Sequence, residues 1–135
     1  MNDLNIILGQ GLGLIKFGMS QNEVLTLLGK TDKEYKTDYN CIRWQYNSLM
    51  IELSFEPENN YSLGWIETYS LETLLFGRKL IGLKRKDIFK FIGKYLKEEV
   101  EIEDYGSFIS INYSKNWLEL QFQFDYLHNI NFGRL

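Results

Sequence analysis

The side chains that most often carry out catalysis or bind metals are few and scattered in this 135-residue sequence. His128 is the only histidine, and a lone histidine without cysteines at ligand spacing is typical of a structural role. Cys41, the only cysteine, lies in a predicted strand with no motif that would stabilise a thiolate. Glu52 and Glu119 could form a carboxylate pair, but neither has an acid–base partner nearby in the sequence, so solvated sheet residues are expected. We therefore predict a protein that is not an enzyme and uses no cofactor or metal.

The glycine-rich segment near the start of the chain does not fit a nucleotide-binding loop. Gly9, Gly11 and Gly13 suggest the dinucleotide motif G-x-G-x-x-G, but the third glycine would fall at Leu14 or Lys16. The phosphate-binding sequence Gly-Lys-Ser/Thr is also missing. We expect these glycines to let the backbone turn into the first strand or pack closely beside it.

The composition is that of one globular domain. Hydrophobic residues make up 44% of the chain and charged residues 24%, and the aromatic share of 16% favours strands and binding surfaces. The segment Met1–Gly9 has no basic region and no cleavage site of a signal peptide, and no apolar run is long enough to span a membrane. A single cysteine forms no internal disulfide and suits a reducing compartment. The expected location is the cytoplasm, without membrane association.

Charge is unevenly distributed along the chain, whose net charge is −3. The segment 78–97 is strongly basic, and the segment 98–104 that follows it is acidic. Two interpretations stay open: a solvated helix face followed by an acidic loop, or a patch that steers a charged partner. The acidic balance argues against direct binding of nucleic acid.

An internal repeat is the clearest pattern in the sequence. Gly18–Lys30 matches Gly82–Lys94 at an offset of about 64 positions, with both glycines, the acidic residue and the apolar positions in common. The match resumes at an offset of about 67, where 42–46 pairs with 109–113 and 50–55 pairs with 117–122. We predict one domain, 1–135, made of repeat 1 (about 1–70) and repeat 2 (about 71–135).

Each repeat begins with a predicted short helix. In repeat 1, Ser20 is a good N-cap and Glu23 completes a capping box, while Gly29 supplies the left-handed stop. In repeat 2, Lys84 replaces the serine, so a weaker helix start is expected, whereas Gly93 preserves the stop. The apolar stripes that face the core are Val24, Leu27 and Leu28, and Ile88, Phe91 and Ile92.

Downstream of each helix the hydrophobic period changes to two, which predicts strands. Three strands are expected in each repeat: 42–46, 49–55 and 63–69, then 109–113, 118–124 and 127–132. Short turns between consecutive strands imply antiparallel pairing. The predicted fold is α+β: two tandem helix-plus-antiparallel-β repeats that form one sheet, with the helices packed on one face.

The second face of that sheet should carry polar and aromatic side chains. Ile66 aligns with Ile130 and is expected to point inward, which places its neighbours Trp65, Glu67 and Tyr69 outward. The other residues expected on this face are Arg43, Gln45, Met50, Glu52, Ser54, Ser110, Asn112, Trp117, Glu119, Gln121 and Gln123. Aromatic residues among arginine and glutamate are typical of protein interfaces, although the rings could instead cap the sheet edge or pack under a loop.

One motif resembles a known superfamily. The segment Gly11–Ser20 (GLGLIKFGMS), then Glu23–Val24 and Leu27–Lys30, resembles the repeat of the β-lactamase-inhibitor-protein-like superfamily, which also includes small outer-membrane assembly lipoproteins. The segment looks most like intracellular members that act as immunity proteins in bacterial polymorphic or contact-dependent toxin systems. The chain departs from the pattern at Lys84, which replaces the serine cap, and at Thr31, where a proline is common. Without a secretory signal, the resemblance implies an immunity protein more than a secreted inhibitor.

The predicted function is therefore to bind a cognate toxin domain, expected to be a nuclease, and to occlude its active site. The acidic segments, including Asp32, Glu34 and Asp38, could contact a basic cleft. The predicted partner-binding residues are Arg43, Glu52, Trp65, Glu67, Tyr69, Trp117, Glu119, Glu101, Glu103 and Asp104. Two alternatives stay open: a small-ligand or enzymatic pocket between helices and sheet that would collect His128 and Cys41, or a scaffold module with no toxin partner.

Overall fold

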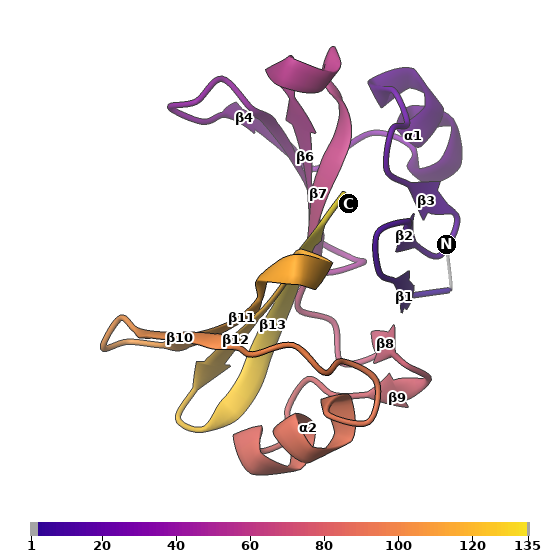
Figure 1. Cartoon of the computed structure of the whole chain (residues 1–135). Coiled ribbons are helices and arrows are strands. Elements are labelled where there is room, and N and C mark those ends of the chain that lie inside the picture. Colours follow the sequence, from indigo (N-terminus) through magenta and orange to yellow (C-terminus); the bar gives the residue numbers. More distant parts are fainter. Residues whose placement is uncertain (1–2, 135) are drawn as a thin grey trace.

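The computed structural model describes residues 3–134 and has an α+β fold, as predicted (Figure 1). Its regular elements are two β-sheets, two α-helices and two short 3-10 helices, η1 (Pro57–Asn59) and η2 (Ser114–Asn116).

A large antiparallel sheet of eight strands forms the body of the protein. Its strand order is β10-β11-β12-β13-β7-β6-β5-β4, so two runs of consecutive strands meet where β7 pairs with β13. The strands of the first run are β4 (Lys33–Lys36), β5 (Ile42–Tyr46), β6 (Ile51–Glu56) and β7 (Ser62–Thr68). Those of the second run are β10 (Glu101–Asp104), β11 (Ile109–Tyr113), β12 (Leu118–Gln123) and β13 (Tyr126–Gly133).

A second, smaller sheet was not foreseen, and the expectation of a single sheet was wrong. It has the order β3-β2-β1-β8-β9, and its strands are β1 (Asn5–Ile7), β2 (Gly11–Leu12), β3 (Ile15–Lys16), β8 (Leu74–Leu75) and β9 (Arg78–Lys79). Strands of two or three residues are too short to show a period of two. Gly11 has the close backbone contact that was expected of these glycines, because a Cβ atom there would lie 2.0 Å from the carbonyl oxygen of Ile15.

The two helices begin as the sequence predicts. Helix α1 (Gln21–Leu28) has a complete capping box: the Glu23 N–H donates to Ser20 Oγ at 3.2 Å, and the Ser20 N–H donates to Glu23 Oε1 at 3.3 Å. Helix α2 (Arg85–Ile92) has Lys84 at its N-cap and no side-chain cap hydrogen bond. Figure 1 shows α1 close to β3 and α2 close to β9.

The ends of both helices differ from expectation. Gly29 has a positive φ of 78°, but its ψ of −166° lies outside the left-handed helical region that was predicted. Gly93 is right-handed with a φ of −57°, and the chain continues in turns that include a bond from Leu96 N–H to Ile92 O. Leu27 is 39% exposed and does not belong to the buried stripe. Only Val24 is buried on α1, because an eight-residue helix turns a narrow face to the core.

The core lies on one face of the large sheet, and the alternation of the strands was predicted correctly. Leu53 and Leu120 are buried, and each pairs across the ladder with an isoleucine, Ile66 and Ile130, that is fully buried. Register shifts occur near these positions, between Ser54 and Phe55 and between Gln121 and Phe122, without inverting the third strands.

The two edge strands correct the expectation of acidic loops. Glu34 lies in β4, and Glu101–Asp104 is the strand β10. Strand β10 is exposed along its whole length and pairs with β11 through its backbone, so no apolar alternation marks it in the sequence. Within residues 3–134, no helix is long and apolar enough to cross a membrane.

Candidate functional site

The face of the large sheet opposite the core carries a row of polar side chains, here called the polar face. Facing residues in antiparallel strands point to the same side of a sheet, so the register defines the row. Glu52 faces Glu67, Glu67 faces Asn131, and Asn131 faces Glu119. Next to this row, also on the polar face, lie Arg43, Gln45, Ser54, Trp65, Ser110, Asn112, Gln121 and Asn129. The predicted outward positions in these strands therefore do share one face.

Glu52 is buried and fully satisfied by neighbours within the polar face. Tyr35 Oη donates to both of its carboxylate oxygens at 3.0 Å, and Gln45 Nε2 donates to Oε1 at 2.7 Å. Arg43 Nη1 lies 3.1 Å from Oε2 and completes an ion pair. Burial and the Glu52 carboxylate raise the pKa of Tyr35. The charge of Glu52 is therefore neutralised by Arg43, and its carboxylate is fixed in place by hydrogen bonds within the sheet.

Glu67 lies in a different environment. Burial raises the pKa of its carboxyl group, and the negative charge of Glu52 directly across the strands adds to the rise. Asn129 Nδ2 donates to Glu67 Oε2 at 3.0 Å, and the Asn131 amide opposes the rise, although its Nδ2 atom makes no well-formed hydrogen bond. No arginine or lysine forms an ion pair with Glu67 within residues 3–134. The charge of Arg43, which pairs with Glu52, lowers the pKa of Glu67 without cancelling the rise.

Glu119 has neutral partners. Ser110 Oγ donates to Glu119 Oε2 at 2.5 Å, and Asn112 Nδ2 donates to Ser110 Oγ at 2.9 Å. Among the residues that the structure describes, no cation pairs with Glu119 either. Glu67 and Glu119 therefore flank Asn131 as two carboxylates without a countercharge.

Two tryptophans flank Gly133, at one side of this acidic row. A Cβ atom on Gly133 would lie 2.4 Å from Cε3 of Trp65 and 3.2 Å from Cε3 of Trp117. Both rings therefore pack into space that a side chain at position 133 would occupy. Trp117 is 54% exposed and has a φ of 50°, a left-handed conformation that is costly for a bulky residue. The rings border a hollow of about 280 Å³ that Glu119 also lines. An exposed aromatic residue held in a strained conformation suggests a binding anchor.

The remaining predicted site residues fall into two groups. Tyr69 directly follows β7, and burial, then the charges of Glu67 and Glu52, raises the pKa of its phenol. Glu101 and Glu103 pair with Asn112 and Ser110 and so share the polar face. Asp104 pairs with Ile109, whose side chain packs against the core, and therefore lies on the opposite face of β10. Its role in binding a partner stays a prediction.

Several residues of the polar face were missed from the sequence. Asn129 and Asn131 alternate with buried residues of β13, and this period of two could have revealed them. Tyr35 lies in the charged strand β4, where no alternation shows which face it joins. That Tyr35 lies on the same face as Glu52 could be found only from the strand register.

The structure offers no obvious catalytic centre within the residues it describes. No group of three or more His, Cys, Asp or Glu side chains is placed to hold a metal ion in residues 3–134. His128 Nδ1 lies 2.9 Å from Asn129 Oδ1, and Cys41 is a half-buried free thiol. Neither His128 nor Cys41 lines the hollow beside Trp65 and Trp117.

Comparisons with known proteins yield structural likeness alone. No protein-family model matches the chain, and no curated protein matches it. A DUF4309 family protein (YjgB) from Bacillus subtilis has a similar structure, with a TM-score of 0.57, 14% identity, and coverage of 94% of this chain and 88% of that one. An extracellular protein containing a SCP domain from Bacillus anthracis is also similar, with a TM-score of 0.56 and 12% identity. The match covers 87% of this chain and 44% of the Bacillus anthracis protein, so this chain spans less than half of that protein's length. At these identities the likeness concerns the fold.

Proposed function

We propose that this chain is a non-enzymatic binding protein that uses its polar face to bind a basic surface of a partner protein. The observation that carries the proposal is the pair of carboxylates without a countercharge, Glu67 and Glu119, beside the exposed ring of Trp117. A cationic side chain of a partner would relieve the raised pKa of Glu67 and pair with Glu119.

The aromatic residues would supply most of the binding energy. Tryptophan and tyrosine are enriched among the few interface residues that dominate affinity, and such residues lie near a desolvated centre. Trp65 and Trp117 border the hollow at Gly133, next to the acidic row. The carboxylates would speed association with a basic partner and select against acidic ones.

We further propose that the partner is a toxin domain, expected to be a nuclease, which this protein neutralises in the cytoplasm by covering its active site. The resemblance of Gly18–Gly29 to intracellular immunity proteins supports this partner. A net charge of −3 and an acidic row suit the basic cleft of a nuclease. A scaffold with a different basic partner would use the same face.

The same proposal includes the tandem repeat, with the helices on one face of the large sheet. The Gly18 N–H donates to Leu63 O, and the Gly82 N–H donates to Leu127 O, both at 2.8 Å. These donors and acceptors are related by the offset seen in the sequence. Figure 1 draws both helices on the same side of the large sheet. This arrangement would leave the polar face free for a partner.

Growth protection tests the function directly. The proposal expects a toxin domain to be encoded beside this chain's gene. That domain is expressed under control, and survival is measured with wild type, Trp117→Ala, Trp65→Ala or the matched control Leu25→Ala. Leu25 is an exposed residue of α1 outside the polar face. The proposal expects wild type and Leu25→Ala to protect, and both tryptophan variants to lose protection. Equal protection by all four proteins would exclude the polar face as the binding surface, and no protection by wild type would exclude the toxin partner.

A further inference from the structure

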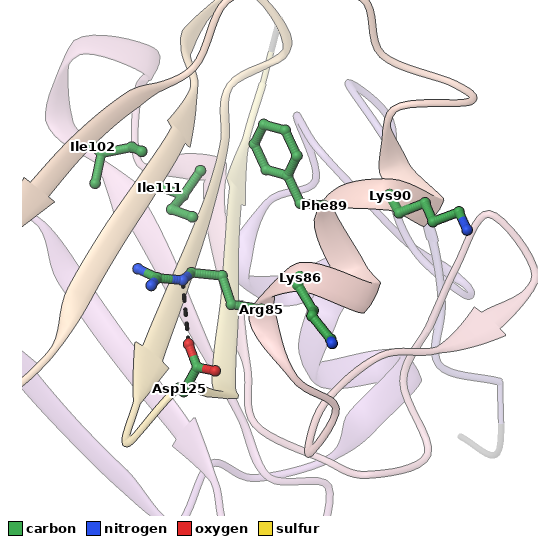
Figure 2. A pocket seen from close by; sticks show the side chains of 7 residues that line it. All are labelled: Arg85, Lys86, Phe89, Lys90, Ile102, Ile111 and Asp125. Carbon is green, nitrogen blue, oxygen red and sulfur yellow. Dashed lines mark ion pairs between the residues drawn. The ribbon is translucent and has the colours of Figure 1, made fainter.

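A second site lies apart from the polar face, in a groove between α2, the edge strand β10 and its neighbour β11 (Figure 2). The groove has a volume of about 380 Å³, within the range of small-molecule sites. Apolar side chains line it from both sides: Phe89 from α2, and Ile102 and Ile111 from the strands. Phe89 is 48% exposed and Ile102 is 59% exposed, so much of this apolar surface is uncovered.

The other end of the large sheet shows why this groove is open. There the corresponding edge pair is Glu34 and Trp44, whereas here it is Ile102 and Ile111. The Trp44 ring is 4% exposed, packs edge-on against Phe55 with centroids 4.7 Å apart, and donates through Nε1 to Glu34 at 2.6 Å. The indole, capped by a carboxylate, therefore occupies the place of Ile111 at the first end, where the nearby hollow of about 420 Å³ is lined by Glu34, Tyr35, Lys36 and Ile42. Two isoleucines leave space at the second end.

The charge at the groove is positive. Arg85, Lys86 and Lys90 line it, against a single acid, Asp125. Arg85 Nε lies 3.2 Å from Asp125 Oδ1, and Figure 2 shows the two terminal nitrogens of Arg85 beyond this contact, on the side of the guanidinium away from α2. A guanidinium group has five N–H donors, so Arg85 can hold Asp125 and still bind a second anion.

We propose that this groove binds a small amphipathic anion: a carboxylate or sulfonate attached to a linear or aromatic apolar body. The apolar body would lie between Phe89 and the two isoleucines, and its burial would supply most of the binding energy. The anionic group would accept paired hydrogen bonds from the terminal nitrogens of Arg85. The combination of an apolar floor with an arginine at its edge selects this class over neutral lipids and cationic amphiphiles.

The test uses fluorescence of anilinonaphthalene sulfonate with the whole chain, followed by competition with decanoate or decyltrimethylammonium. The variants are Phe89→Ala and Arg85→Gln in the groove and Leu25→Ala as the matched control on α1, where Leu25 is 38% exposed. Each protein is first shown to unfold cooperatively, so that fluorescence from loosely folded chains is excluded.

The expected result is saturable fluorescence that decanoate abolishes and decyltrimethylammonium leaves unchanged. Arg85→Gln and Phe89→Ala should each weaken binding by about tenfold or more, whereas Leu25→Ala and the polar-face variant Trp117→Ala should bind as wild type does. The proposal is overturned if no saturable binding occurs, if the cationic amphiphile competes equally, or if Leu25→Ala weakens binding as much as Phe89→Ala. A partner protein that loses affinity with Phe89→Ala, together with no binding of decanoate, would assign the groove to that partner instead.

Discussion

The two halves of the large sheet solve the same structural problem in different ways. In the half formed by β4–β7, Glu52 is satisfied by Arg43, Tyr35 and Gln45. In the half formed by β10–β13, Glu119 has the neutral partner Ser110 in its place. The edge pairs also differ, because a buried indole packs on Phe55 at one end of the sheet, whereas an apolar groove lies at the other end. Glu52 in the first half has an ion pair, whereas Glu67, in β7 of the same half, and Glu119, in the second half, have none within residues 3–134. The second half also has the apolar groove beside α2.

Removing the buried Trp44 ring, at the β4–β5 end of the sheet, should have the largest effect on stability. Trp44→Ile removes the ring contact with Phe55 and the bond to Glu34, and it leaves a cavity in the core. We expect the free energy of unfolding to fall by about 3 kcal/mol. Denaturant unfolding measures the change. In the matched variant, Ile111→Trp, the new ring would lie in the groove, and the free energy of unfolding should fall by less than half as much. Equal losses in the two variants would refute the contrast between the two ends.

The helix starts differ by one cap. Ser20→Ala removes the hydrogen bond to the Glu23 N–H and should lower the free energy of unfolding by about 1 kcal/mol. Lys84 has an extended backbone suited to a cap but forms no cap hydrogen bond, so Lys84→Ser should stabilise the protein by about 0.5 kcal/mol. Thermal or denaturant unfolding of the two variants decides the point, and a destabilising Lys84→Ser would contradict it.

Two buried tyrosines provide a finer comparison. Tyr46 Oη donates to the Gly29 carbonyl at 2.9 Å, at the end of α1, whereas Tyr113 forms no side-chain hydrogen bond within residues 3–134. Tyr46→Phe should therefore lower the free energy of unfolding by slightly less than about 1 kcal/mol, and Tyr113→Phe should leave it nearly unchanged.

The same tyrosines give a dependence on alkaline pH. Burial, then the charge of Asp32, raises the pKa of Tyr46 to about 12, and burial, then the charge of Glu98, raises that of Tyr113 to about 12. The folded chain holds these protons more tightly than the unfolded chain does, so stability should fall as pH rises from 10 to about 12. Each Phe variant should reduce this fall, as measured by unfolding at several pH values.

The smallest expected effect concerns the uncompensated carboxylate of the polar face. Because burial and Glu52 raise the pKa of Glu67, the folded state binds its proton more tightly, and stability should fall as pH rises above the ordinary carboxyl range. Glu67→Gln should remove this fall and stabilise the free protein at neutral pH. The matched variant Glu52→Gln should destabilise it instead, because Glu52 accepts bonds from Arg43 and Tyr35. Unfolding at acidic and neutral pH separates these outcomes.

The sequence predicted those parts of the fold that have a repeating local signal. The cap at Ser20 and the alternation around Ile66 and Ile130 were sufficient to place α1 and most of the polar face. Other parts depend on contacts between distant residues. Strand β10 and the small sheet are held by backbone pairing, and the conformation of Gly93 follows from the turns after α2.

The candidate site was recovered in part for the same reason. Arg43, Glu52, Glu67 and Glu119 could be assigned to one face from their alternation, but the different partners of the three carboxylates could not. Whether a carboxylate is neutralised depends on which residue lies across the strand, and that register is set by the whole sheet.

The affinity of the polar face for its toxin partner tests the central claim most directly. Isothermal titration calorimetry of the purified partner should compare wild type with Trp117→Ala and with Phe89→Ala, which changes the groove on α2. The account predicts that Trp117→Ala weakens binding by at least about 2 kcal/mol and that Phe89→Ala leaves it unchanged. Unchanged affinity in both Trp117→Ala and Trp65→Ala would contradict it.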